Sequence, residues 1–252
     1  MVSINNQLSE KKVTEKEIVV ALAGNPNTGK STIFNALTGL KQHTGNWPGK
    51  TVSYARGNYV HRGKSFVLVD LPGTYSLLAN SIDELIARDF ICFAKPDVTI
   101  VVTDATNLIR NLNLALQIME ATNNVVVAIN LLDEAERKGI IVNIDKLSEK
   151  LGLPVVGTVA RNQMGLNRLK DTIDDIVTKK IVTNPLKIHY PPEIEQKIQE
   201  MTPELENILK GELNPRWVAL RILEGDKTLI DSIKQYLVYK EIDIKGEVAL
   251  CH

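Results

Sequence analysis

The sequence predicts an α/β fold built on a mostly parallel, doubly wound sheet, followed by a small all-helical domain. Short runs rich in Val, Ile and Leu alternate with amphipathic stretches as far as residue 180. Such apolar runs are typical of parallel strands that helices cover on both faces. Prolines then occur at positions 185, 191 and 192, and the segments beyond them have helical rather than strand patterns.

The strands are predicted from runs that are apolar and β-branched. They cover residues 18–23, 66–69, 98–102, 125–129 and 154–156. A hairpin is also predicted, because residues 51–60 and 64–69 are joined by the short connection His61-Arg62-Gly63. The hairpin adds one antiparallel edge strand to the otherwise parallel sheet.

The helices are predicted from apolar residues at helical spacing. In the first part of the chain they cover residues 30–38, 81–93, 108–120 and 166–178; after residue 185 they cover residues 193–200, 203–209, 215–223 and 228–239. The domain organisation that follows is a flexible leader over residues 1–17, an α/β domain over residues 18–180 and a helical domain over residues 181–252.

Composition limits the classes of partner. Thirty basic residues balance thirty acidic ones, and the pI is near 6.9, so nucleic acid is not expected as the main ligand. The two cysteines fit a reduced, cytosolic compartment, and no run approaches the roughly 18 apolar residues that span a bilayer. The four histidines have no metal-ligand spacing, so iron binding by this segment is not predicted.

A complete G-x-x-x-x-G-K-[ST] motif lies between the first predicted strand and the helix after it, the context that a phosphate-binding P-loop requires. Its residues are Gly24, Asn25, Pro26, Asn27, Thr28, Gly29, Lys30 and Ser31, with Thr32 next. The glycines let the backbone direct N–H groups at the β-phosphate, and the helix N-terminus adds partial positive charge. Lys30 would bridge the β- and γ-phosphates, and Ser31 would give its hydroxyl to Mg²⁺.

A D-x-x-G sequence ends the predicted strand at residues 66–69. It consists of Asp70, Leu71, Pro72 and Gly73. In the strand beside the P-loop, Asp70 is expected to bind Mg²⁺ through water, and the Gly73 N–H is expected to sense the γ-phosphate.

The choice of base is predicted from Asn130, Leu131, Leu132 and Asp133, which follow the strand at residues 125–129 and are similar to the N-K-x-D box of GTPases. The Asp133 carboxylate would accept hydrogen bonds from the guanine N1–H and exocyclic amine, a pair that adenine lacks. Leu131 stands where that box has lysine, so modest affinity and fast exchange are expected. A backbone N–H of Val159, Ala160 or Arg161 would contact the guanine carbonyl.

A further segment carries a family resemblance. Residues 45–52, Gly-Asn-Trp-Pro-Gly-Lys-Thr-Val, together with the P-loop and residues 70–77, resemble the G domain of the ferrous iron transport protein B family. The resemblance runs from about residue 18 to residue 161, and the helical segment is similar in size to the family's helical domain. It implies a P-loop GTPase fold and the cytosolic N-terminal part of a membrane transporter. The membrane-embedded portion of the same transporter would be its partner, at the cytoplasmic face of the membrane.

The resemblance also implies roles for the intervening segment. Thr51 would bind Mg²⁺ and touch the γ-phosphate, with Gly49 and Lys50 beside it in the nucleotide site. Asn27 would hold K⁺ together with carbonyls of Gly45 and Trp47, which makes Lys30, Thr51 and Asn27 the catalytic set. Alternatively, Asn27 only stiffens the loop and Trp47 is a packing anchor.

Hydrolysis is expected to be slow. Thr74 follows the D-x-x-G sequence where many signalling GTPases carry a glutamine that orients water, and no other side chain obviously replaces it. Two other functions stay open: a non-catalytic GTP sensor, and a ribosome- or tRNA-associated GTPase, which the neutral charge disfavours. The oligomeric state, including self-association, is not predicted.

Overall fold

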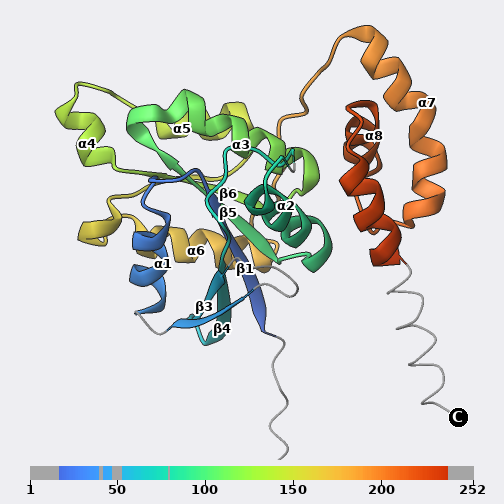
Figure 1. Cartoon of the computed structure of the whole chain (residues 1–252). Helices are drawn as coiled ribbons and strands as arrows, with labels where there is room; N and C mark the ends of the chain where they lie inside the picture. The colour runs from blue at the N-terminus through green and yellow to red at the C-terminus, as the bar shows by residue number, and fades with distance from the viewer. Residues whose placement is uncertain (1–16, 40–41, 47–52, 79, 238–252) are drawn as a thin grey trace, which may run out of the picture.

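The computed structural model describes residues 17–39, 42–46, 53–78 and 80–237. Its centre is a seven-stranded sheet with the order β2-β3-β4-β1-β5-β6-β7 (Figure 1). The strands are β1 (Ile18–Gly24), β2 (Gln42–Asn46), β3 (Ser53–His61), β4 (Lys64–Asp70), β5 (Val98–Asp104), β6 (Val125–Asn130) and β7 (Val155–Gly157). Each strand predicted from the sequence is present, and its observed ends lie within two residues of the predicted ones.

The sheet is mostly parallel, as predicted. Strand β1 pairs in parallel with both β4 and β5, and β6 pairs in parallel with β5 and β7. Strand β3 runs antiparallel to β4, which confirms the hairpin, and β2 pairs antiparallel with β3. Strand β2 was not predicted, because its sequence, Gln-His-Thr-Gly-Asn, has no apolar alternation.

Helices cover both faces of the sheet. Helices α1 (Lys30–Thr38) and α6 (Leu166–Val177) pack on one face, and α2 (Ile82–Asp89), α3 (Leu108–Ala121) and α5 (Ile144–Leu151) pack on the other (Figure 1). Alternate residues of β1 enter different cores: Val20 and Leu22 contribute to the first, and Ala21 and Ala23 to the second. Burial on both faces explains why this strand is apolar throughout.

Three predicted helices differ from the observed ones. The prediction for residues 81–93 is confirmed only as far as Asp89, after which Phe90–Ala94 forms a π-helical turn. The predicted pair at residues 193–200 and 203–209 is wrong: α7 is one helix, Pro192–Leu209, with Pro203 inside it. Burial of Ile198, Leu205 and Leu209 on one face outweighs the backbone hydrogen bond that a proline cannot donate.

The remaining helices include two that were not predicted, α4 (Leu132–Arg137) and α5. Helix α8 spans Pro215–Leu223 as predicted, and residues 227–237 are helical. Within the described ranges, no helix combines the length and the apolar character needed to cross a bilayer.

A third core joins the C-terminal helices to the α/β part. Trp217 and Leu220 of α8 pack with Ile198 and Leu209 of α7, and Cys92 of the π-helical turn belongs to the same cluster. Beside it, the fully buried Arg88 guanidinium pairs with Asp226 at 3.0 Å and donates to Thr228 at 2.9 Å. Arg88 lies in α2, so the helix that follows the D-x-x-G sequence is tied directly to the C-terminal helices.

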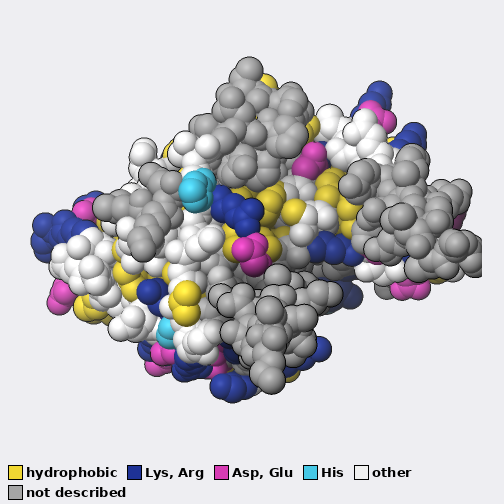
Figure 2. All heavy atoms as spheres, turned by 90° about the horizontal axis from the view of Figure 1, so that it is seen from below, with side chains coloured by type: hydrophobic (Ala, Val, Ile, Leu, Met, Phe, Trp, Pro, Cys, Tyr) yellow, Lys and Arg dark blue, Asp and Glu magenta, His cyan; other side chains and the backbone are white. Residues whose placement is uncertain are grey.

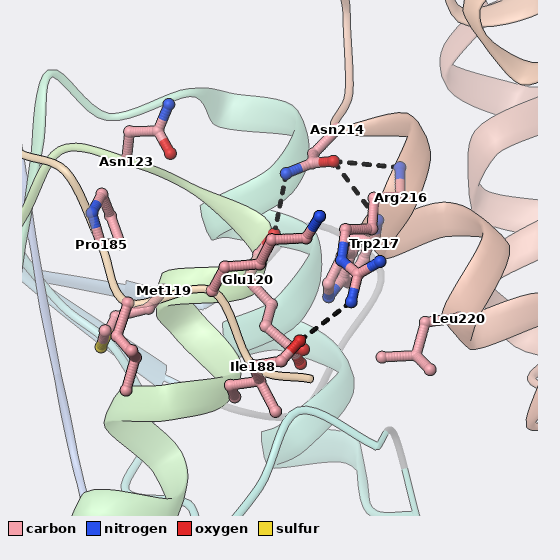
Figure 3. A pocket seen from close by; sticks show the side chains of 11 residues that line it. Met119, Glu120, Asn123, Pro185, Ile188, Asn214, Arg216, Trp217 and Leu220 are labelled. Carbon is pink, nitrogen blue, oxygen red and sulfur yellow. Dashed lines mark hydrogen bonds between the residues drawn. The ribbon is translucent and has the colours of Figure 1, made fainter. Parts of the chain in front are cut away.

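A second junction surrounds a cavity of about 190 Å³ between α3, residues 185–188 and α8 (Figure 3). The Asn214 side chain caps α8 and also donates to the Glu120 carbonyl at 3.1 Å. Arg216 pairs with Glu195 of α7 at 2.7 Å and donates to the Ile188 carbonyl at 2.9 Å. Asn214 and Arg216, which line this cavity, thus hold the C-terminal helices to α3 and to residues 185–188.

The β3–β4 hairpin is fixed to α6 by charge. Arg62 lies within 3.1 Å of carboxylates of Asp171, Asp174 and Asp175, and Lys64 pairs with Asp174 at 2.5 Å. Burial acts to raise the pKa of Asp174, but the hydrogen bonds from Lys64 and Arg62 outweigh it and lower that pKa.

Basic and acidic side chains are interspersed on the face seen from below in Figure 2.

Candidate nucleotide-binding site

The predicted site residues meet at one edge of the sheet. Gly24, Asp70, Asn130 and Gly157 are the last residues of β1, β4, β6 and β7. Because these strands are parallel, their carboxyl ends share that edge, which is where open α/β sheets bind ligands.

The P-loop has the backbone shape that phosphate binding requires. A Cβ on Gly24 would lie 2.7 Å from the Val102 carbonyl oxygen, so only glycine fits beside β5. Gly29 has a φ of 80°, and a Cβ there would collide with the Asn130 side chain. The Thr28 hydroxyl donates to the Asn25 carbonyl at 2.9 Å and closes the loop. Both motif glycines are therefore explained by space and conformation.

The N-terminus of α1 is suited to an anion. The helix begins at Lys30 after Gly29, and no acidic residue lies in its first turn. Ser31 and Thr32 in that turn are exposed, as are Pro26 and Asn27. The positive end of the helix dipole is therefore not neutralised by a carboxylate of the helix itself.

Lys30 and Asp70 form an ion pair across the site. Burial raises the pKa of Asp70, and the charge and hydrogen bond of Lys30 oppose that rise. The Asp70 carboxylate and the Ser31 hydroxyl are hard oxygen donors, which fits Mg²⁺. Within the described residues, no group of three or more His, Cys, Asp or Glu side chains forms an all-protein metal site.

The D-x-x-G segment lies against the P-loop. The Thr74 N–H donates to the Gly24 carbonyl at 3.2 Å, and the Leu71 N–H donates to Leu22 at 3.0 Å. A Cβ on Gly73 would lie 3.4 Å from the Pro26 backbone. A group bound by the P-loop therefore lies within reach of Gly73.

Asn130 connects three segments of the site. Its Nδ2 donates to the Thr28 carbonyl at 3.0 Å, and its Oδ1 accepts from the Ala160 N–H at 3.0 Å and the Thr158 hydroxyl at 3.2 Å. The sequence predicted a role for Asn130 in base selection. It did not predict Thr158, because Thr158 belongs to no recognisable motif. In the structure, Asn130 braces the P-loop against the loop after β7.

Asp133 lies in the first turn of α4, after Leu131, whose φ is 63°. One carboxylate oxygen, Oδ1, is buried and has no partner among the described residues. The other, Oδ2, pairs with the guanidinium of Arg161. Leu132 packs against Gly157, where a Cβ would lie 2.6 Å from its Cδ1. The acceptor predicted for the base is thus present, partly unsatisfied, at the end of β6.

The loop over residues 159–161 has its N–H groups largely in use. Val159 donates to Met164 at 3.1 Å, and Ala160 donates to Asn130. The Arg161 N–H is therefore the remaining candidate, within the described residues, for the guanine carbonyl.

Some predicted residues cannot be placed. Trp47, Gly49, Lys50 and Thr51 lie outside the described residues. Gly45 lies in β2, opposite Tyr54 of β3. Asn27 adopts a φ of 66°. Asn25, only 2% exposed, has neither side-chain polar atom paired within the described chain.

Comparison with known proteins identifies the family. The profile described as "Ferrous iron transport protein B" matches residues 18–173, more than half of the chain. The chain belongs to the FeoB family. A second profile, "FeoB cytosolic helical domain", matches residues 190–248.

Individual relatives agree. The chain is 44% identical over 227 residues to the Fe(2+) transporter FeoB of Methanocaldococcus jannaschii, covering 90% of this chain and 34% of the relative. It is 40% identical over 216 residues to an Fe(2+) transport protein A/FeoB fusion protein of Porphyromonas gingivalis, covering 84% of this chain and 26% of the relative. The chain thus spans about a quarter to a third of the length of these FeoB proteins.

Solved FeoB structures share the fold. The cytosolic domain of T. maritima FeoB in its GMPPNP form matches with a TM-score of 0.78 at 39% identity, covering 87% of this chain and 86% of that one. The FeoB G domain from Methanococcus jannaschii matches with a TM-score of 0.58 at 48% identity, covering 65% of this chain and 99% of that one.

Proposed function

We propose that this chain binds GTP and hydrolyses it to GDP and phosphate, as the cytosolic regulatory domain of a ferrous iron transporter. The observation that carries the proposal is the arrangement at the sheet edge. The P-loop, Lys30 and the α1 N-terminus offer positive charge at one end, and the Asp133 carboxylate offers a partly unsatisfied acceptor at the other. GDP- and GMPPNP-bound forms of the T. maritima FeoB cytosolic domain support the same ligand class.

Phosphate binding would change the partner of Lys30. In the structure its ammonium neutralises Asp70. A triphosphate would attract that ammonium to the β- and γ-phosphates, and the Asp70 carboxylate would then be available through water to Mg²⁺, as would the Ser31 hydroxyl. Mg²⁺, when bound, supplies charge neutralisation of the phosphate oxygens. The role of Thr51, which would bind Mg²⁺ and touch the γ-phosphate, is proposed from the family resemblance.

Guanine would be selected at Asp133. Guanine has two N–H donors for the carboxylate, whereas adenine has no such pair and would leave the buried Oδ1 of Asp133 without a partner, at a cost of about 1–3 kcal/mol. This difference alone favours guanine over adenine by about 5- to 150-fold.

GTP hydrolysis in the absence of K⁺ would be slow. The Thr74 side chain, which stands where a water-orienting glutamine often occurs, is 3% exposed and donates its hydroxyl to the Ser76 carbonyl at 2.8 Å. It is therefore engaged in its own turn rather than available to water. K⁺, when bound at Asn27 with carbonyls of Gly45 and Trp47, would supply the positive charge that an arginine finger supplies elsewhere.

The transporter context extends the proposal beyond this chain. The partner would be the membrane-embedded portion of the same protein, at the cytoplasmic face of the membrane. The buried contacts of Arg88 with Asp226 and Thr228 give α2 a direct link to the C-terminal helices. A nucleotide-dependent movement after Gly73 could reach the helical part by that route.

The test is steady-state GTP hydrolysis at matched ionic strength in K⁺ and in Na⁺, for wild type and Asn27→Ala. K⁺ should accelerate hydrolysis at least tenfold in wild type and little in Asn27→Ala, because the variant lacks the amide oxygen proposed as a ligand. Equal hydrolysis rates in both salts would contradict the proposal that K⁺ activates hydrolysis. Nucleotide binding without turnover in either salt would favour a non-catalytic GTP sensor. The observation that supports this alternative is that the Thr74 hydroxyl donates to the Ser76 carbonyl and so is not available to orient water as a catalytic glutamine would.

A further inference from the structure

The guanidinium of Arg161 forms an ion pair with Asp133, the carboxylate proposed to recognise the base. Arg161 lies in the short 3₁₀ turn Ala160–Asn162, which follows β7, and its Nη2 pairs with Asp133 Oδ2 in the first turn of α4. Arg137 is also near, but its Nη2 is 3.8 Å from the same oxygen, beyond hydrogen-bond distance. Leu131 provides no charge at the position where the N-K-x-D box has lysine.

Arg161 and guanine have the same chemistry at this point. The guanine edge that faces an aspartate contains N1–H, C2 and the exocyclic N2 amine, which together form a guanidine group with parallel N–H donors. The arginine side chain ends in a guanidinium with the same parallel donors and a full positive charge. Arginine and guanine can therefore each donate hydrogen bonds to the oxygens of one carboxylate.

The two cannot be bound in the same way at once. Asp133 Oδ1 is buried and has no partner among the described residues, so Oδ2 is the oxygen that Arg161 takes from an incoming base. The loop that carries Arg161 is held by the Ala160 N–H to Asn130 Oδ1 bond at 3.0 Å. The Arg161 side chain itself is 52% exposed. Release therefore needs only rotation of this side chain into water, with the loop unchanged.

We propose that Arg161 is an internal competitor for guanine: it occupies Asp133 in the nucleotide-free protein and must leave before the base binds. The proposal rests on guanine recognition by Asp133, the function proposed above. It makes Arg161 a determinant of affinity and of guanine-over-adenine discrimination.

The expected size follows from the strength of such pairs. When the binding-competent state is a fraction of the total, the apparent Kd rises by the inverse of that fraction. Exposed ion pairs shift an equilibrium by about 1.5- to 5-fold. Arg161 should therefore weaken guanine binding by about 1.5- to 5-fold, and high salt should reduce this effect by screening the pair.

The test is calorimetric titration of the full chain with GDP and with ADP. The variants are Arg161→Gln, which removes charge and parallel donors, and Arg161→Lys, which keeps the charge alone. Arg137→Gln is the matched control, since it removes a neighbouring positive charge that makes no hydrogen bond to the Asp133 carboxylate.

The proposal expects GDP to bind Arg161→Gln about 1.5- to 5-fold more tightly than wild type, with ADP not tightened and Arg161→Lys in between. Raising salt from about 50 to 500 mM should shrink the difference between wild type and Arg161→Gln. Arg137→Gln should not tighten GDP binding, because loss of positive charge alone disfavours an anionic ligand.

Unchanged or weaker GDP binding in both Arg161 variants, with thermal melts like wild type, overturns the proposal and assigns Arg161 to holding the base. Equal tightening of GDP and ADP also overturns it, because competition for Asp133 concerns guanine alone. Failure of the proposed function has a different signature: wild type would then bind GDP no better than ADP.

Discussion

At the residue scale, Asn130 is the side chain on which the geometry of the site depends most. It is 1% exposed and bonds to Thr28 of the P-loop and to Ala160 and Thr158 beyond β7. A buried amide with its donors and acceptors paired is costly to remove, because its partners are left unpaired. The phosphate end and the base end of the site are thereby held in one arrangement.

Asn130→Ala should therefore lower the free energy of unfolding by about 2 kcal/mol and weaken GDP binding by about tenfold or more. Chemical denaturation and calorimetric titration measure the two effects. Asn167→Ala, at an exposed position of α6, is the matched control and should change neither by much. A destabilised Asn130→Ala protein that still binds GDP like wild type would restrict Asn130 to a role in folding.

The site residues differ in how far the sequence could predict them. The motif glycines, Lys30 and Asp70 were predicted because spacing alone defines their context, and the structure brings them together at one edge. The brace made by Asn130 and the contact of Arg161 with Asp133 could not be predicted, since they depend on loops that lie 28 or more residues apart in sequence.

At the element scale, the predicted segments fail where tertiary packing overrides local propensity. Pro203 in α7 ends a helix by local rules, yet the buried face of Ile198, Leu205 and Leu209 keeps α7 continuous. The π-helical turn at Phe90–Ala94 directs Ile91 into the sheet core and Cys92 into the core of the C-terminal helices. Strand β2 forms by pairing with β3, although its own sequence is polar.

The contact between α7 and α8 should depend on pH through Glu195. Hydrogen bonds from Arg216 and from the Tyr190 backbone N–H lower the pKa of Glu195 to about 2 from its ordinary 4.5. A lowered folded-state pKa stabilises the fold above pH 4.5, and this contribution is lost as the pH falls from 4.5 toward 2.

Glu195→Gln should be less stable than wild type at pH 6, and the difference between the two proteins should be much smaller at pH 2.5. The measurement is denaturant unfolding at both pH values, followed by fluorescence of the buried Trp217 in a Trp47→Phe background. A stability difference that stays constant with pH would mean that the Glu195 charge contributes nothing to this junction.

At the scale of the whole molecule, the parallel sheet brings motifs far apart in the sequence into one site, and polar junctions attach the C-terminal helices to it. Arg88 with Asp226 forms one such junction, and Asn214 with Glu120 forms another. The class of fold was predictable because both cores of the sheet leave apolar runs in the sequence. The junctions were not, because their polar partners have no local pattern.

The most direct test of the central claim, that this chain is a guanine-specific nucleotide hydrolase, is kcat/KM for GTP and XTP with wild type and Asp133→Asn. Loss of the carboxylate should lower kcat/KM for GTP by about 10- to 100-fold, since hydrogen bonds to a charged group contribute about 1.5–3 kcal/mol. XTP should become the better substrate of the variant, because the asparagine amide can donate to the xanthine O2. A variant that hydrolyses GTP within twofold of wild type and gains nothing with XTP would contradict the account.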